Sequence, residues 1–444
     1  MKRALVLSGG GSKGAYEAGF ISAAKELNQH FDIVTGTSIG ALNGALVAMG
    51  DYEGLEYTWN ILDMDHVFNN APDLSDLRDD FMTTSLFNKE EGNNLAELKE
   101  SIAQQTSLAQ SFLKYYFKNK GADNTPFVEH CRGLMDEERL LSSPIDFGIC
   151  TVQFPSMKPC FKTKSEMERG HMLDYLLASS ACFPVFPMTE INGNKYIDGG
   201  FSDNLPIDLA LDMGADEIVV VDMHLIPVHP QYINRPSIIY SCPPVDLGGF
   251  MDFSKDVLER NKRLGYLTAY KLFGNYEGNR YTFLPSAQTI FHAYYKQLLM
   301  MEKEMRGFFN SNSSELTSLL LEANHQIILN IKDYTYITLD FIGELLGFDD
   351  LKVYAFEEYK NMILNAFEKY MEKDYFPQEL SLTKVNLSFL QNHLNRESIV
   401  GFFLHQMQYK ESMDMKSYYT FCKKELMMAS LIYLLMGGVT DEHH

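Results

Sequence analysis

A serine in a glycine-rich turn is the residue of this chain best suited to nucleophilic chemistry. Residues 36–40 read Gly-Thr-Ser-Ile-Gly and lie between an apolar run and a helical run of small residues. A serine on such a strand-to-helix turn is presented as a nucleophile, and Gly36 and Gly40 let the neighbouring backbone pass close to Ser38. The alternative is an ordinary turn in which Ser38 caps the following helix.

A second glycine-rich turn at residues 8–14 reads Ser-Gly-Gly-Gly-Ser-Lys-Gly and also follows an apolar run. Consecutive glycines expose N–H groups, so we expect an oxyanion hole here. A dinucleotide site is the rival interpretation, but its ribose-binding acid belongs at the end of the next strand, and Asp32 lies at the start. A phosphate-binding loop is excluded because no Lys-Ser/Thr pair follows. Lys13 either assists the anion or is a solvated helix-start lysine. The residues expected to form the oxyanion-hole loop are Gly9, Gly10, Gly11, Ser12, Lys13 and Gly14.

Acyl transfer needs a nucleophile, oxyanion donors and a base, and Asp198 is the base that we favour. It ends a strand pattern and precedes Gly199 and Gly200, which allow close approach to a serine at the same rim of a parallel sheet. A desolvated carboxylate with a raised pKa can accept the hydroxyl proton. An ordinary Asp-Gly turn is the structural alternative. His224, just after the apolar run 217–223, is the alternative base of a serine–histidine–acid triad.

Composition narrows the class of protein. Among 444 residues, 59 acids outnumber 38 bases, which gives a net charge of −21 and argues against nucleic acid and anionic lipid as electrostatic partners. Six scattered cysteines favour reduced thiols over disulfides. Neither a signal peptide nor a membrane-spanning run is apparent, so we expect a cytoplasmic protein. No histidine, cysteine or carboxylate cluster has metal-ligand spacing.

The order of apolar runs, turns and helical patterns predicts an α/β fold with a mostly parallel central sheet flanked by helices. We expect a catalytic domain at residues 1–270, with helices at 51–140 covering the sheet. Connecting helices are expected at 271–309, and a mostly helical C-terminal domain of unknown role at 310–444.

The two turns, the Asp-Gly-Gly sequence and residues 178–184 (Ala-Ser-Ser-Ala-Cys-Phe-Pro) together resemble the patatin-like phospholipase family over residues 4–211. The resemblance implies a three-layer α/β/α sandwich and a Ser–Asp dyad without a catalytic histidine. In that dyad Ser38 is the nucleophile and Asp198 the base. The N–H groups of Gly10 and Gly11, together with that of Ser12, would form the oxyanion hole. Neither a metal nor an organic cofactor is implied.

The chemistry implied by the resemblance is hydrolysis of a lipid acyl ester, from a phospholipid or lysophospholipid, through an acyl-enzyme that releases free fatty acid. Transient contact with a membrane or micelle surface goes with such a substrate. Thioesterase and transacylase activities remain open within the enzyme class. A regulatory or partner-binding protein is the alternative from another class. Its patatin-like site would be closed or vestigial, and residues 310–444 would recruit a protein partner whose identity the sequence does not reveal.

Overall fold

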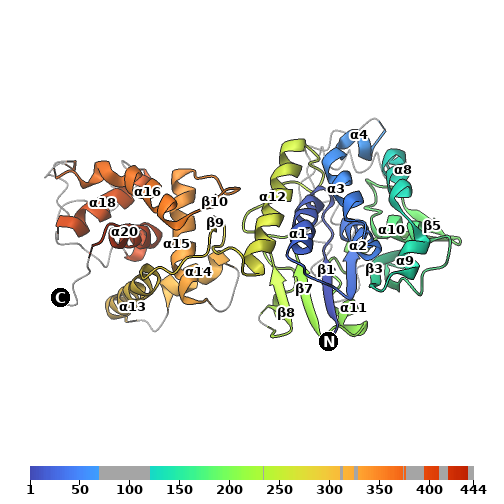
Figure 1. Ribbon diagram of the computed structural model, residues 1–444, viewed down its shortest axis with the longest axis horizontal. Helices are drawn as coiled ribbons and strands as arrows, with labels where there is room; N and C mark the ends of the chain where they lie inside the picture. Colours follow the sequence, from blue (N-terminus) through green and yellow to red (C-terminus); the bar gives the residue numbers. More distant parts are fainter. Residues whose placement is uncertain are drawn as a thin grey trace. The chain divides into compact units, whose positions relative to one another are not determined.

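A computed structural model of the chain describes residues 1–69, 121–233, 235–310, 314–324, 329–373, 375–376, 395–409 and 419–438. Contacts divide the chain into two compact units, Met1–Leu272 and Phe273–His444 (Figure 1). The larger part of the cover expected at 51–140 lies outside the described residues.

An eight-stranded sheet forms the centre of the first unit, in the order β5-β6-β3-β2-β1-β7-β8, with β4 paired to β3. Neighbouring strands among β3, β2, β1, β7 and β8 are parallel, whereas β4, β5 and β6 join antiparallel. The strands are β1 (Arg3–Leu7), β2 (Ile33–Thr37), β3 (Asp146–Phe154), β4 (Lys158–Thr163), β5 (Thr189–Ile191), β6 (Asn194–Asp198), β7 (Glu217–Val221) and β8 (Ile238–Ser241). The expected mostly parallel sheet is confirmed.

Helices cover both faces of this sheet, which gives three layers (Figure 1). Gly44 of α2 approaches Val34 and Phe147 on one face. On the other, Leu209 and Met213, at α11 and its C-terminal end, lie against Gly148. The helices of this unit are α1 (Gly14–Glu26), α2 (Ile39–Met49), α3 (Tyr52–Ile61), α4 (Met64–Val67), α8 (Thr125–Leu134), α9 (Glu137–Ser142), α10 (Met172–Ser179), α11 (Ile207–Asp212) and α12 (Lys255–Leu272), with 3-10 turns η1 (Gly11–Lys13), η2 (Gly199–Phe201) and η3 (Pro230–Tyr232).

Helices α1 and α12 cross at backbone contact because glycines meet there. A Cβ on Gly19 would lie 1.8 Å from the carbonyl oxygen of Lys262, and one on Gly265 would lie 1.8 Å from that of Tyr16. Any larger residue would push the two helices apart, so this crossing fixes α1, and with it the glycine turn at its N-terminus.

One strand is displaced from its expected position. The apolar pattern predicts a strand at 31–34, but β2 runs from Ile33 to Thr37, because residues 35–37 also pair with Gly148–Cys150 of β3. Pairing across the sheet therefore extends β2 through the polar residues up to Ser38.

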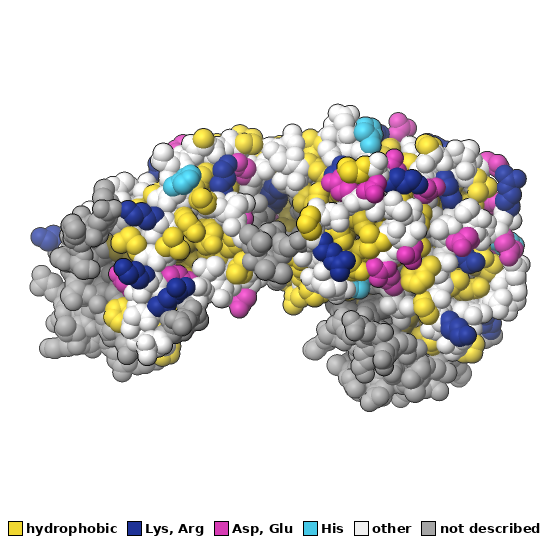
Figure 2. Space-filling view, turned by 90° about the horizontal axis from the view of Figure 1, so that it is seen from below, with side chains coloured by type: hydrophobic (Ala, Val, Ile, Leu, Met, Phe, Trp, Pro, Cys, Tyr) yellow, Lys and Arg dark blue, Asp and Glu magenta, His cyan; other side chains and the backbone are white. Residues whose placement is uncertain are grey.

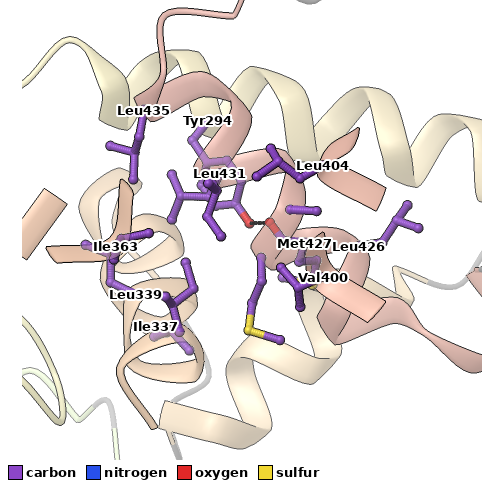
Figure 3. Close-up of a cluster of buried hydrophobic side chains, with 14 of the residues drawn as sticks. Tyr294, Ile337, Leu339, Ile363, Val400, Leu404, Leu426, Met427, Leu431 and Leu435 are labelled. Carbon is purple, nitrogen blue, oxygen red and sulfur yellow. Dashed lines mark hydrogen bonds between the residues drawn. The ribbon is translucent and has the colours of Figure 1, made fainter. Parts of the chain in front are cut away.

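The second unit is mostly helical, as expected, with one short parallel pair of strands. Its buried cluster includes Leu339, Val400 and Leu431, and the buried Tyr294 hydroxyl donates to the carbonyl oxygen of Met427 at 3.1 Å (Figure 3). The elements are β9 (Thr282–Phe283), α13 (Ile290–Phe309), α14 (Glu315–Asn324), α15 (Ile331–Leu346), β10 (Val353–Tyr354), α16 (Phe356–Phe367), η4 (Glu368–Met371), α18 (Arg396–Tyr409) and α20 (Lys423–Leu435). The roles expected for 271–309 and 310–444 remain predictions.

On the face of the first unit drawn in Figure 2, acidic and basic side chains are interspersed, with hydrophobic side chains between them. Among the described helices, none combines the length and apolar character needed to cross a bilayer.

Candidate active site

Ser38 occupies a strained turn between β2 and α2. Its backbone has φ 56° and ψ −126°, a conformation that residues other than glycine rarely adopt. Its hydroxyl does not cap α2, which removes the alternative interpretation of this serine. Its N–H instead donates to Ser179 Oγ at 3.0 Å, and Ser179 Oγ donates to the carbonyl oxygen of Cys150 at 2.6 Å. These two bonds hold the turn against β3 and leave the Ser38 hydroxyl available.

The glycines on either side of Ser38 are required by close backbone contacts. A Cβ on Gly36 would lie 2.4 Å from the carbonyl oxygen of Gly40, and one on Gly40 would lie 2.5 Å from that of Ser8. The second contact brings the start of α2 against the first glycine turn. Both glycines thus let backbone segments approach each other beside Ser38.

Asp198 is fully buried and bonded to Ser38. Its Oδ2 accepts a hydrogen bond from Ser38 Oγ at 2.7 Å, and its Oδ1 accepts one from Gly200 N–H at 2.8 Å. A Cβ on Gly199 would lie 2.1 Å from the carbonyl oxygen of Cys150, so glycine permits this approach to β3. Burial raises the pKa of Asp198 to about 7, although both hydrogen bonds lower it.

The route by which Asp198 reaches Ser38 differs from the one expected. The prediction placed both residues at one rim of a parallel sheet, but β6 is antiparallel to β3. Strand β3 continues past the end of β2, and β6 pairs with this extension, so Asp198 lies opposite Thr151 while Thr37 lies opposite Cys150. Strands β2 and β6 therefore run in opposite directions and end beside adjacent residues of β3.

Most members of the first glycine turn use their N–H groups within the protein, Gly9 and Ser12 among them. Gly9 N–H donates to the carbonyl oxygen of Asn204 at 3.0 Å, and Asn204 Nδ2 donates back to the carbonyl oxygen of Gly9 at 3.1 Å. Ser12 N–H donates to the carbonyl oxygen of Phe250 at 2.8 Å. These bonds fix the turn and remove Ser12 from the donors available to a ligand.

The N–H groups of Gly10 and Gly11 are different. Within the described part of the chain, neither is bonded to an acceptor, and both residues line the pocket that contains Ser38. Gly11 has φ 56°, and a Cβ there would lie 2.1 Å from the carbonyl oxygen of Phe250. Only glycine fits this position.

Lys13 and Gly14 complete the turn. Lys13 is only 8% exposed and lines the pocket, which differs from a solvated lysine at a helix start. Gly14 begins α1, and a Cβ there would lie 2.5 Å from Ile39 Cγ1. It therefore serves packing between α1 and α2.

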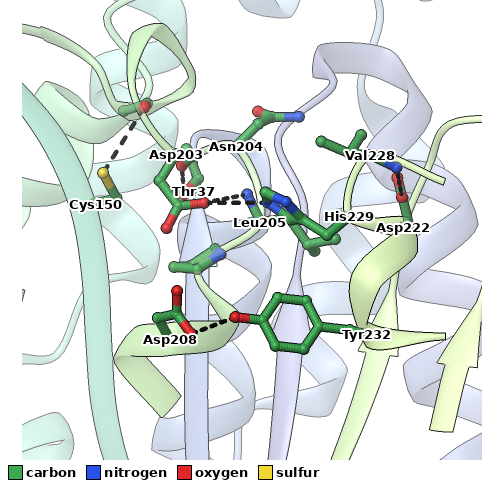
Figure 4. Close-up of polar contacts among 12 residues, drawn as sticks. Thr37, Cys150, Asp203, Asn204, Leu205, Asp208, Asp222, Val228, His229 and Tyr232 are labelled. Carbon is green, nitrogen blue, oxygen red and sulfur yellow. Dashed lines mark hydrogen bonds and ion pairs between the residues drawn. The ribbon is translucent and has the colours of Figure 1, made fainter. Parts of the chain in front are cut away.

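The alternative base, His224, lines the same pocket but is paired elsewhere. Its Nδ1 lies 2.6 Å from Oδ1 of the buried Asp222, whose Oδ2 accepts from the Tyr240 hydroxyl at 2.6 Å. The same Oδ2 accepts from Val228 N–H at 2.9 Å (Figure 4). Burial raises the pKa of Asp222, but these partners outweigh it and hold that pKa below its ordinary value. The Ser38 hydroxyl is bonded to Asp198 instead.

A dinucleotide site at the first glycine turn would need a ribose-binding acid nearby, and Asp32 does not lie there. Asp32 Oδ2 accepts from Arg3 N–H at 2.8 Å, at the start of β1, whereas the glycine turn follows the end of that strand. The Asp32 carboxylate and the first glycine turn thus lie at opposite ends of strand β1.

Several residues that brace the site carry no local signal in the sequence. Thr37 Oγ1 donates to the carbonyl oxygen of Asp203 at 2.8 Å, which ties the segment after β6 to β2 (Figure 4). Asp203 Oδ1 accepts from Leu205 N–H at 3.0 Å and lies 3.8 Å from His229 Nε2. Ser179 lies in the 178–184 stretch, where the family resemblance offered the one available clue.

The pocket around Ser38 encloses about 780 Å³ of space, which includes its open mouth. Most of its wall is apolar. Its lining residues are Gly9, Gly10, Gly11, Lys13, Ser38, Ile39, Leu42, Leu62, Val67, Phe127, Ser180, Cys182, Phe186, Asp198, Asn204, His224, Phe250, Met251 and Phe253. In the described ranges, no three His, Cys, Asp or Glu side chains are grouped so that they could hold a metal ion.

Comparisons with curated proteins find relatives of low identity. Lysophospholipase nte1 of Aspergillus terreus is 24% identical over 219 residues, and lysophospholipase NTE1 of Meyerozyma guilliermondii is 22% identical over 327 residues. These alignments cover 49% and 62% of this chain but only 12% and 19% of the relatives. The chain thus corresponds to a small part of each relative's length.

Among solved structures, VipD from Legionella pneumophila is similar with 15% identity and a TM-score of 0.39, over 85% of this chain and 88% of VipD. The family model described as patatin-like phospholipase matches residues 5–211, which contain both glycine turns and Asp198. The chain therefore carries a patatin-like phospholipase domain over residues 5–211, and the resemblance predicted from its motifs is confirmed.

Proposed function

We propose that this chain is a serine acyl hydrolase that cleaves the acyl ester of a phospholipid or lysophospholipid through Ser38 and Asp198. The 2.7 Å hydrogen bond between Ser38 Oγ and the buried Asp198 carboxylate is the observation that carries the proposal. The family of residues 5–211 and the lysophospholipase names of the curated relatives support the substrate class.

In the first half of the proposed reaction, Asp198 accepts the Ser38 proton as Oγ attacks the acyl carbonyl carbon. Negative charge develops on the carbonyl oxygen, where the N–H groups of Gly10 and Gly11 are the donors available to it. When the tetrahedral intermediate collapses, the bond to the alcohol breaks and Asp198 returns the proton to the leaving oxygen. The products are the free alcohol and an acyl-Ser38 ester.

In the second half, Asp198 accepts a proton from water, and the resulting hydroxide attacks the acyl-Ser38 ester. Collapse releases the fatty acid, and the proton returns to Ser38 Oγ. Since burial raises the pKa of Asp198 to about 7, its basicity is suited to proton transfer near neutral pH. A carboxylate of ordinary pKa would be the weaker base.

The pocket wall supports a lipid rather than a sugar or peptide ester. Polar side chains, Ser38 and Asp198 among them, are joined by apolar walls that include Phe186 and Met251. A hydrocarbon chain gains from burial against such walls, whereas a polar substrate would lose its hydration without replacement partners.

The test is hydrolysis by the full chain of mixed micelles containing lysophosphatidylcholine or phosphatidylcholine, with palmitoyl-coenzyme A as a thioester. We expect release of free fatty acid from at least one glycerophospholipid, and no release by Ser38→Ala. Activity restricted to the thioester would replace the phospholipid assignment by a thioesterase. A well-folded wild type that is inert on all substrates would favour a closed or vestigial site.

A further inference from the structure

A second cavity lies beside the candidate active site, within the first unit. It is lined by fifteen residues contributed by α2, α3, α8, α10 and the residues that end α3 and α8, and it encloses about 490 Å³ including its mouth. We name it the distal cavity. Its lining is almost wholly hydrocarbon, which raises the question of what it can hold.

The distal cavity shares walls with the pocket around Ser38. Ile39, Leu42, Leu62 and Phe127 line both spaces. Ile39 directly follows Ser38 in the chain, and Leu42 lies on the same helix. These four apolar side chains therefore form a wall common to both spaces, and an acyl chain that extended from Ser38 into the distal cavity would pass apolar side chains there.

The polar side chains of the distal cavity are already satisfied. Asn43 donates to Glu17 Oε2 at 3.0 Å and to the carbonyl oxygen of Gly14 at 3.2 Å, and its Oδ1 accepts from Trp59 Nε1 at 2.9 Å. The amide of Asn43 thus already has hydrogen-bond partners within the protein and does not favour a polar ligand.

The polar side chains of Thr58 and His130, which also line the distal cavity, contact each other. Thr58 Oγ1 donates to the carbonyl oxygen of Gly54 at 2.8 Å and lies 3.0 Å from His130 Nε2. Burial lowers the pKa of His130 and raises that of the Cys131 thiol to about 12, so both are uncharged near neutral pH. A ligand in the distal cavity meets hydrocarbon and no charge, and apolar cavities bind apolar molecules.

We propose that the distal cavity holds the hydrocarbon end of the acyl chain whose carbonyl is attacked by Ser38, and that its size sets the preferred chain length. This assignment rests on the proposed acyl hydrolase function. Each methylene that reaches the cavity should raise kcat/KM about fourfold, until the cavity is full.

Two leucines on α10 provide a matched pair for the test. Leu173 and Leu177 are one helical turn apart and both half-buried, but only Leu173 lines the distal cavity, and neither lines the pocket around Ser38. Leu173→Trp fills the cavity, and Leu177→Trp adds the same bulk outside it. Met135→Trp, at the end of α8, fills the cavity from another element and guards against misfolding of one variant.

The measurement is kcat/KM for p-nitrophenyl esters of 4 to about 16 carbons, together with binding of a fluorescent long-chain fatty acid. We expect Leu173→Trp and Met135→Trp to hydrolyse the butanoate like wild type but to lose at least tenfold on the longest ester and in fatty-acid affinity. Leu177→Trp should follow wild type throughout.

Parallel chain-length profiles for wild type and both cavity-filling variants would overturn the assignment while leaving the hydrolase proposal intact. A chain that hydrolyses no ester but binds the fatty acid, with at least tenfold weaker binding in both cavity variants, would reject the hydrolase and with it the role in chain-length preference, and would leave the distal cavity as a fatty-acid binding site. Fatty-acid binding unchanged by both variants would reject the cavity, whatever the activity.

Discussion

The two glycine-rich turns of the first unit are built alike but expose different groups. Each follows a buried parallel strand, precedes a helix and contains a residue at φ 56°, which is Gly11 in the first turn and Ser38 in the second. At Gly11 the carbonyl oxygen of Phe250 occupies the space of a Cβ. At Ser38 a side chain fits, and its hydroxyl reaches Asp198.

The strand–turn–helix unit alone therefore does not determine which group each turn presents to the pocket. The segments that contact each turn determine it. Phe250 crosses the first turn and binds Ser12 N–H, which leaves the backbone of Gly10 and Gly11 facing the pocket. Ser179 binds the second turn at the N–H of Ser38 and so turns the side chain, rather than the backbone, toward the ligand space.

The same substitution in both turns gives the largest expected contrast. Ser38→Ala should reduce kcat for ester hydrolysis by about 10⁴-fold or more, because among the described residues no other hydroxyl bonds to Asp198. Ser12→Ala loses one hydrogen bond to the carbonyl oxygen of Gly249, at 2.9 Å, and should change kcat less than about threefold. Comparable losses in the two variants, measured at equal folded fraction by circular dichroism, would break the comparison.

Removing the base should have the next largest effect. Asp198→Asn is expected to lower kcat about 10³-fold, since an amide cannot accept the Ser38 proton. In wild type, kcat/KM should rise with pH through about 7 as Asp198 ionises, and the residual activity of the variant should lose this rise. Asp32→Asn, exposed at the opposite end of strand β1 from the first glycine turn, is the control and should leave the profile unchanged. A retained pH profile in Asp198→Asn would return His224 as the base.

Adding a side chain to the first glycine turn should lower kcat less than replacing Ser38 or Asp198. Gly11→Ala forces a Cβ toward the carbonyl oxygen of Phe250 and should lower kcat about 10²-fold by displacing the proposed oxyanion donors. Gly214→Ala is a matched control, because Gly214 also has positive φ but no described heavy atom lies within 4 Å of its Cβ position. Equal kinetics for the two variants would remove the first turn from the proposed site.

The smallest expected effect is on stability. The folded-state pKa of Asp198, about 7, exceeds its ordinary value of 3.8, so folding favours the protonated form. The stability that this group contributes is present below its ordinary pKa and is lost as pH rises through about 7. Asp198→Asn should therefore be more stable than wild type by at least about 1 kcal/mol at pH ~8, with no gain below pH ~4. Thermal unfolding across this range provides the check, and a variant that is less stable at high pH would contradict it.

The local parts of the site could be predicted from the sequence. The glycines that permit close contacts, Ser38 on its turn and the mostly parallel sheet all leave traces in short stretches of residues. The pairing that unites them does not. Asp198 meets Ser38 because β6 lies antiparallel on the extension of β3, and that depends on register between strands far apart in the chain.

Contacts at long range also separate the members of the first turn. Nothing in residues 8–14 indicates that Ser12 N–H is taken by Phe250 while Gly10 and Gly11 are left to the pocket. The burial of Lys13 is equally invisible locally, since a lysine at a helix start is usually solvated. Such features follow from packing rather than from propensity.

The most direct test of the central claim is covalent labelling with a fluorophosphonate, followed by mass spectrometry of the peptides. The reagent phosphonylates an activated serine next to oxyanion donors. The proposed dyad predicts a single adduct, on the peptide containing Ser38, and its loss in Ser38→Ala. An adduct on another serine, or ester hydrolysis that persists in Ser38→Ala, would contradict the assignment of Ser38 as the nucleophile.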